Sequence, residues 1–172
     1  VVIVGSVGST LEANAAFAAR ILAKGVEHAE PRRFPGTSPN AGAGHVAIAF
    51  GLGGLAHAVG AGAGAVVEAL EVARDWLQAG DLEAVLVVGA EQAGPTATRA
   101  LSAAGLEPPG QGSLALLLST IGPGAVLDQA LLEKARSFSQ SPECAGFRAL
   151  EAVKRAVGLP GPGGFGTVRP PE

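Results

Sequence analysis

Short apolar runs separated by helical segments constrain the fold of this chain more than any other feature of its sequence. Four runs have the length and the Val, Leu and Ile content of buried strands. They are Val1–Gly5, Leu55–Val59, Leu82–Val88 and Leu114–Ile121. Apolar residues also recur at helical spacing from Leu11 to Leu22 and from Val66 to Leu77. Because strands that alternate with helices favour a mostly parallel sheet, we expect an α/β fold with helices flanking that sheet.

The expected helices carry capping signals at their starts. Ser9-Thr10-Leu11-Glu12 matches a capping box, in which the Ser9 and Glu12 side chains bind the first free amides of the helix that follows. Asn40 is a suitable N-cap for a further helix that runs to about Phe50. The last two strand-like runs are expected to be joined by a loop.

The chain divides near Ile121. Residues 1–121 contain all four runs and are expected to form one domain, which is long enough to bury a core. Residues 122–172 are expected to form a tail with two polar-faced helices, Asp128–Arg136 and Phe147–Val157, and a poorly ordered, Pro/Gly-rich end, Leu159–Glu172. The chain contains no methionine, so we expect its native start to lie upstream of Val1.

Composition argues against several classes of function. A net charge of −3 provides no basic surface for phosphate backbones, so no nucleic-acid partner is expected. The single cysteine, Cys144, excludes an internal disulfide and a cysteine-based zinc site, and it fits a reducing cytosol. A membrane-spanning helix needs about 20 continuous apolar residues. The longest uncharged stretch, Phe34 to Val67, is rich in glycine and is interrupted by His45 and His57, so no membrane insertion is expected.

Five motifs follow one another between Asn40 and Glu91. They read Asn-Ala-Gly-Ala-Gly-His-Val-Ala-Ile (40–48), Gly-Leu-Gly-Gly (51–54), Ala-Gly-Ala-Gly-Ala (61–65), Gln-Ala-Gly-Asp (78–81) and Ala-Val-Leu-Val-Val-Gly-Ala-Glu (84–91). In this order they resemble the N-terminal half of the β-ketoacyl-ACP synthases, members of the thiolase superfamily. The resemblance covers about Val1 to Ile121. It implies a thiolase-like half-domain in which the third motif is the nucleophile elbow.

The resemblance places the catalytic cysteine of that family at Ala63. The chemistry requires a thiolate at a helix N-terminus, where the helix dipole stabilises the anion. A methyl group cannot form a thioester. The two catalytic histidines of the family belong to its second half, and the neighbours of His45 match a first-half helix instead. The resemblance therefore implies a non-catalytic chain that needs no cofactor and no metal.

An inactive homologue of this kind resembles the chain length factor of type II polyketide synthases, although a typical one has glutamine at the position of Ala63. The resemblance implies a cytoplasmic heterodimer with an active ketosynthase, to which an acyl carrier protein presents the growing chain. Four residues of the first helix would line the acyl tunnel: Leu11, Asn14, Ala15 and Ala18. Six consecutive residues would form the dimer interface: Leu55, Ala56, His57, Ala58, Val59 and Gly60.

Two other interpretations remain open at this point. The strand Leu55–Val59, the glycines Gly60 and Gly62, a helix, a strand and then Glu91 outline a dinucleotide-binding βαβ unit. The acid lies 31 residues after Gly60 (91 minus 60) rather than about 20 after the glycines, which weakens this match. Alternatively, the chain is a structural thiolase-like homodimer that never contacts substrate.

Overall fold

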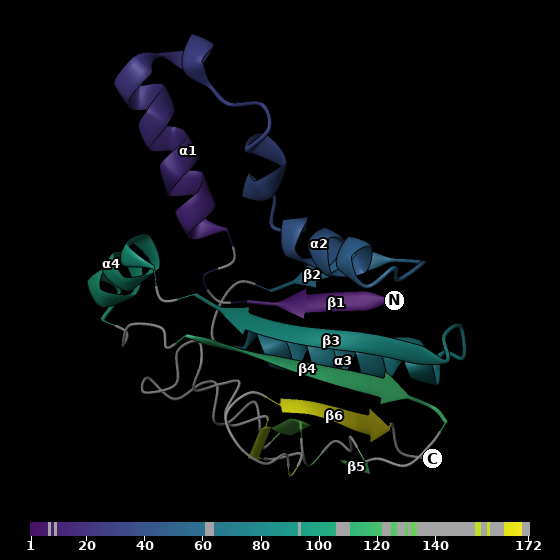
Figure 1. Cartoon of the computed structure of the whole chain (residues 1–172). Coiled ribbons are helices and arrows are strands. Elements are labelled where there is room, and N and C mark those ends of the chain that lie inside the picture. Colours follow the sequence, from purple (N-terminus) through teal and green to yellow (C-terminus); the bar gives the residue numbers. More distant parts are fainter. Residues whose placement is uncertain are drawn as a thin grey trace.

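The computed structural model describes residues 1–6, 8, 10–60, 64–92, 94–105 and 111–121, together with 125–126, 130, 132–133, 154–155, 158 and 164–169. Within these residues, six strands form one sheet in the order β2-β1-β3-β4-β6-β5 (Figure 1). The strands are β1 (Val2–Gly5), β2 (Ala56–Val59), β3 (Ala84–Glu91), β4 (Gly112–Ser119), β5 (Ala125–Val126) and β6 (Gly164–Arg169). Neighbouring strands are parallel except β3 and β4. The expected α/β fold with a mostly parallel sheet is confirmed.

Helices flank both faces of this sheet. The described helices are α1 (Leu11–Lys24), η1 (Val26–His28), η2 (Phe34–Thr37), α2 (Ala41–Ala49), α3 (Ala65–Gln78) and α4 (Pro95–Ala103). Ile3 joins the core formed with α3, whereas its neighbour Val4 lies against α2 at Gly42. Because successive residues of a strand point to opposite faces, α2 and α3 cover opposite faces of the sheet.

The core lies between α3 and one face of the sheet. Buried and partly buried residues alternate strictly along β3, and Val85 and Val87 are among the buried ones. In the antiparallel pairing with β4, these two residues lie opposite Leu118 and Leu116. On α3, Val66, Leu70, Ala73 and Leu77 recur at helical spacing and are buried against this layer. Burial of each large apolar side chain contributes about 1.5–3 kcal/mol, which is the main reason the helix forms here.

Residues 10–37 extend away from the sheet and are called the arm below. The arm contains α1, η1 and η2, and Figure 1 shows α1 (purple) projecting beyond the edge of the sheet. No residue of α1, η1 or η2 is buried. At its base, the Thr10 hydroxyl and the Asn14 amide both donate to the carbonyl of Thr37, at 3.0 and 2.9 Å. These bonds join the two ends of the arm to each other.

Three local predictions differ from the structure. The capping box is wrong: Ser9 lies outside the described residues, the N-cap of α1 is Thr10, and Glu12 reaches α4 instead of its own helix. The loop predicted after β3 contains α4, and the Pro/Gly-rich end contains β6, which pairs with β4. Asn40 does occupy the N-cap position of α2, but its side-chain amide donates to the carbonyl of Ala56 at 3.1 Å.

The division of the chain at residue 121 stays a prediction. Most of the two helices predicted at 128–136 and 147–157 lies outside the described residues. Over the part of the chain that the structure describes, no helix combines the length and the apolar character that crossing a membrane requires.

A candidate site at the carboxyl edge of the sheet

A cavity of about 250 Å³ opens where three parallel strands end. Since β1, β2 and β3 are mutually aligned, their carboxyl ends meet at one edge of the sheet. The lining comprises residues from these three ends, from the base of the arm and from the start of α2. They are Val4, Ser6, Thr10, Pro39, Gly42, Ala58, Val59, Gly60, Ala90, Glu91 and Gln92. Ligands of open α/β sheets bind at this kind of crevice, so the cavity is the candidate functional site.

The polar lining is dominated by one buried carboxylate. Glu91 is only 5% exposed, and its Oε2 accepts a hydrogen bond from the backbone N–H of Gly8 at 3.2 Å. Thr10 donates its hydroxyl proton to Thr37 and is thereby oriented. Among the described residues that line the cavity there is no cysteine, histidine or lysine. This lining can hold a polar group but supplies no thiol and no imidazole base.

The predicted nucleophile position, Ala63, lies outside the described residues, together with residues 61 and 62. Its flanks are described. Gly60 ends the β2 segment with φ +69°, and Gly64 is the N-cap of α3. A Cβ at Gly60 would lie 2.9 Å from the Cα of Ala65, so the residue that follows β2 and the first residue of α3 lie close together. This closeness is compatible with the predicted nucleophile elbow, whose position stays a prediction.

The four residues predicted to line an acyl tunnel all lie on the arm, and none of them lines the cavity. Leu11, Asn14 and Ala18 are exposed and Ala15 is half-buried. Asn14 is engaged at the base of the arm with Thr10 and Thr37. Their role as a tunnel wall therefore requires a second chain and stays a prediction.

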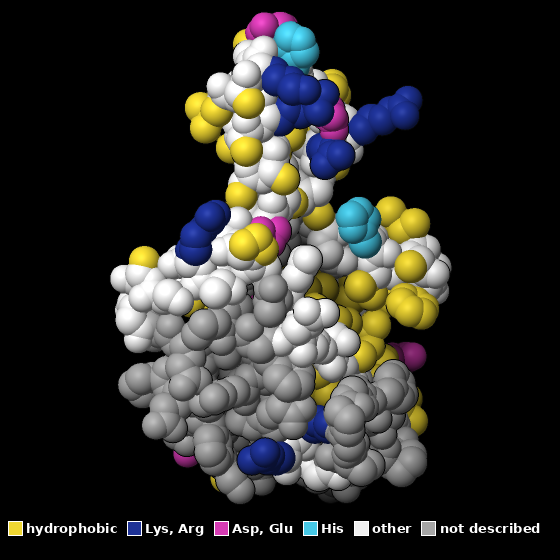
Figure 2. Space-filling view, turned by 60° about the vertical axis from the view of Figure 1, so that its left-hand side comes forward, with side chains coloured by type: hydrophobic (Ala, Val, Ile, Leu, Met, Phe, Trp, Pro, Cys, Tyr) yellow, Lys and Arg dark blue, Asp and Glu magenta, His cyan; other side chains and the backbone are white. Residues whose placement is uncertain are grey.

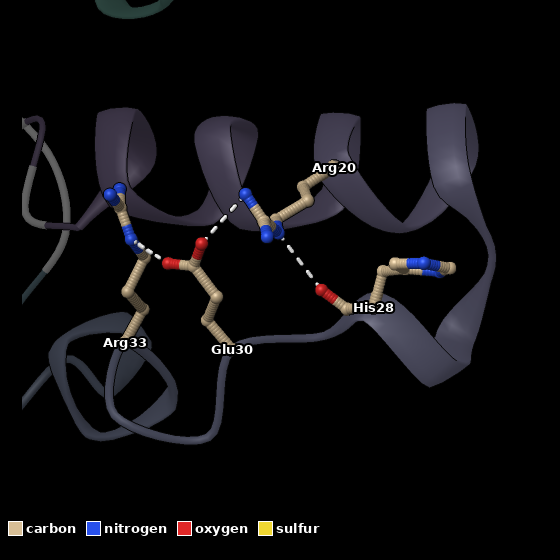
Figure 3. Close-up of polar contacts among 4 residues, drawn as sticks. All are labelled: Arg20, His28, Glu30 and Arg33. Carbon is tan, nitrogen blue, oxygen red and sulfur yellow. Dashed lines mark hydrogen bonds and ion pairs between the residues drawn. The ribbon is translucent and has the colours of Figure 1, made fainter.

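An ion-pair network holds the far end of the arm (Figure 3). Arg20 of α1 donates from Nε to the carbonyl of His28 at 2.9 Å, and its Nη1 lies 2.6 Å from Glu30 Oε1. Arg33 pairs with the other oxygen of Glu30. In Figure 2 charged and histidine side chains gather at this end, and hydrophobic side chains lie along the arm. Leu22 of α1 is 87% exposed. The arm is held by polar contacts at both ends and exposes apolar side chains to solvent, which makes it suitable for contact with another chain.

The residues predicted as the dimer interface lie on or beside β2, at one edge of the described sheet. On its other side β2 pairs with β1 over Ala56 to Val59. Leu55 is 52% exposed, and the ring of His57 lies 6.2 Å from that of Trp76 on α3. Near this edge, Ile48 and Phe50 at the end of α2 are 81% and 74% exposed. An unpaired strand edge beside exposed apolar side chains suits pairing with another chain. The interface itself stays a prediction.

The dinucleotide-binding interpretation receives less support from the geometry. Glu91, the acid of the dinucleotide outline, is buried and already accepts the amide of Gly8. Gly62 of that outline lies outside the described residues. Over the described part of the chain, no group of three or more His, Cys, Asp or Glu side chains is placed to hold a metal ion.

Comparison with solved structures gives matches to ketosynthase complexes. One is a chain of "the ishigamide ketosynthase/chain length factor": it is 28% identical, the TM-score is 0.50, and the alignment covers 53% of this chain and 26% of that one. Another belongs to a ketosynthase in complex with its chain length factor from Xenorhabdus doucetiae. It is 21% identical with a TM-score of 0.52, and the alignment covers 62% of this chain and 44% of that one. At this identity the match shows a similar fold only. The match thus spans less than half of either solved chain. No curated protein sequence matches this chain.

The family model described as "Beta-ketoacyl synthase, N-terminal domain" matches residues 2–114. The matched region holds β1 to β3, the cavity at their carboxyl ends and all five motifs between Asn40 and Glu91. It includes the position of Ala63. Because residues 2–114 make up more than half of the 172 residues, the chain belongs to the β-ketoacyl synthase family.

Proposed function

We propose that this chain is a non-catalytic, chain-length-factor-like subunit that pairs with an active ketosynthase. The proposal rests on family membership together with the alanine at position 63, where the resemblance places the catalytic cysteine of the family. The solved structures that it resembles contain ketosynthases together with chain length factors, which supports a ketosynthase as the partner.

In this proposal the partner performs the chemistry. Its cysteine would hold the acyl chain as a thioester, and its two histidines would assist decarboxylative Claisen condensation on units delivered by an acyl carrier protein. The described lining of the cavity in this chain offers no thiol or imidazole for these steps. In the proposed pair, the ketosynthase is therefore the one active member.

The β2 edge is the proposed contact with the partner. Residues Leu55 to Gly60 would pair with the corresponding strand of the ketosynthase through the backbone groups of that edge, among which the carbonyl of Ala56 already accepts the Asn40 amide. The exposed side chains of Ile48 and Phe50 would extend the apolar contact. Obligate interfaces are large and more apolar than the rest of a protein surface, which agrees with these uncovered side chains.

The arm is the proposed determinant of chain length. Leu11, Asn14, Ala15 and Ala18 would face the far end of the tunnel in the ketosynthase, where the volume of side chains limits the acyl chain. The small side chains of Ala15 and Ala18 would leave space there. This role is supported by the projection of α1 away from its own sheet, because such a helix can reach a neighbouring chain.

Co-expression with the ketosynthase encoded nearest to this chain tests the proposal. Size-exclusion chromatography with mass determination is expected to give a stable one-to-one complex, with this chain aggregated when it is expressed alone. A self-contained homodimer that ignores the ketosynthase would contradict the proposal and favour the structural alternative. In that case an NAD(H) titration would separate the structural protein from a dinucleotide-binding domain.

A further inference from the structure

Two carboxylates cross-connect the segments that leave β1 and β3. Glu12, in the first turn of α1, accepts hydrogen bonds from the backbone N–H groups of Thr96 and Ala97 at 2.6 and 2.9 Å. Glu91, the last residue of β3, accepts one from the N–H of Gly8, between β1 and α1, at 3.2 Å. Each of the two segments therefore donates backbone amides to a carboxylate carried by the other.

The two segments are also in close contact. A Cβ on Gly94 would collide with the side chain of Glu12, and a Cβ on Gly8 would lie 3.7 Å from the Cβ of Ala97. The amides that Glu12 accepts belong to the first turn of α4, where backbone donors have no partner within their helix and the helix dipole favours negative charge. The pKa of Glu12 is accordingly lowered, chiefly by the Ala97 amide.

These bonds differ from the others at the base of the arm. Thr10 and Asn14 reach Thr37, so they join one end of the arm to the other. The Glu12 bonds join α1 to α4, which follows directly from the central strand β3. They therefore set the direction in which the arm leaves the sheet.

We infer that Glu12 and Glu91 form a two-way carboxylate clasp that fixes the direction of the arm, with Glu12 as the principal positioning residue. Neither residue needs to touch an acyl chain for this role. The consequence for chain length rests on the proposed function: if α1 reaches a partner's tunnel, Glu12 determines where it arrives. The direction of the arm itself does not depend on that function.

Distances between two spin labels on the full chain test the clasp. The labels are placed on Lys24→Cys in the last turn of α1 and Gln78→Cys in the last turn of α3, in a Cys144→Ser background, and read by pulsed electron paramagnetic resonance. The parent is expected to give one narrow distance distribution. Glu12→Ala is expected to shift it and to lose the narrow peak. Glu12→Gln is expected to retain that peak, because its carbonyl oxygen still accepts both amides.

Two further variants separate positioning from general destabilisation. Gly94→Ala leaves Glu12 in the sequence but places a methyl group where the Glu12 carboxylate lies. It is therefore expected to shift the distance distribution as Glu12→Ala does. If Glu12→Ala does not fold, Gly94→Ala provides the test of the clasp. Glu27→Ala removes a carboxylate at the far end of the arm, whose Oε1 lies 3.5 Å from Nδ1 of His28, and is expected to leave the distance distribution unchanged. Unchanged distributions in folded Glu12→Ala and Gly94→Ala would overturn the clasp. A shifted distribution with unchanged product length in the ketosynthase complex would support the clasp and contradict the proposed tunnel role.

Discussion

The side chain at position 63 separates the proposed non-catalytic role from a catalytic one. It lies in sequence between Gly60, where the β2 segment ends, and Gly64, the N-cap of a helix of 14 residues. A thiol at such a helix start has a lowered pKa, because the backbone amides and the helix dipole favour the thiolate.

Ala63→Cys is therefore expected to create a reactive thiol. In a Cys144→Ser background its pKa should fall below the usual value of about 8.5, and iodoacetamide should alkylate it rapidly at neutral pH. The matched control is Gln78→Cys at the other end of α3, where the dipole has the opposite sign and no activation is expected. Rates are measured against pH by mass spectrometry. Equal pH profiles for the two cysteines would show that the start of α3 does not lower the pKa of a thiol at position 63.

Glu12 is expected to make stability depend on pH in one direction. Its folded-state pKa is lowered from 4.5, first by the amide of Ala97 and also by Thr96 and the positive charge of Arg99, although desolvation opposes this. A carboxylate with a depressed folded pKa stabilises the fold above its unfolded pKa, and this contribution is lost as the pH falls through the folded value. The melting temperature of the parent should therefore exceed that of Glu12→Gln at pH 7, and the difference should shrink below pH 4.5. Calorimetry of both proteins measures this difference, and subtraction of the variant removes the titrations that the two proteins share. A difference that grows on acidification would contradict the assignment.

Among the elements, the contact between β1 and α3 holds the two central layers together. A Cβ on Gly5 would lie 2.5 Å from the carbonyl oxygen of Ala65, so the first turn of α3 rests directly on the strand backbone. Gly5→Ala is expected to push the helix away and to lower the free energy of unfolding by about 1–3 kcal/mol, as overpacking does. Urea denaturation measures the change. The control is Gly44→Ala in α2, where an added Cβ meets nothing within 4 Å and should stabilise the helix by about 0.5–1 kcal/mol. Equal effects at the two glycines would contradict the close approach.

The β2 edge is the element on which the proposed assembly depends. Leu55→Lys places a charge beside that edge, which disfavours strand pairing with a partner. We expect at least about a 10-fold weaker complex with the ketosynthase, a loss of about 1.4 kcal/mol in binding free energy, and little change in the stability of the chain. Ile121→Lys is the control, because Ile121 is also an exposed apolar residue but follows β4, away from β2. Titration followed by size-exclusion chromatography measures both. Equal weakening by the two variants would argue against the β2 edge as the interface.

For the whole molecule, hydrophobic periodicity and sequence motifs predicted the central fold. The features that they did not predict depend on contacts between residues far apart in the sequence. The buried alternation of β3 and the apolar face of α3 are local patterns, so they could be predicted. Helix α4 begins at Pro95, a favoured first helical residue, but it has only 9 residues and includes Thr96 and Thr98, which are poor helix formers. The partners of Glu12 lie 84 and 85 residues away along the chain, and no local pattern identifies them. The cavity could be anticipated only from the family resemblance, since its lining comes from several separate segments.

The length of the product depends on the assembled complex, and one helix face is expected to control it. Ala18 is exposed on α1, on the side proposed to meet the tunnel, so Ala18→Phe should fill space there and shorten the acyl chains that the complex releases. Ala19→Phe adds the same volume on the next position, which points about 100° away around the helix, and should leave the product unchanged. Mass spectrometry of products from both complexes measures the effect, and size-exclusion chromatography confirms that each heterodimer is intact. Unchanged lengths with Ala18→Phe in an intact complex would remove the tunnel role of α1. Shortening by both variants would place the effect in the docking of the arm as a whole, because only a helix that presents one fixed face to the tunnel can distinguish neighbouring positions.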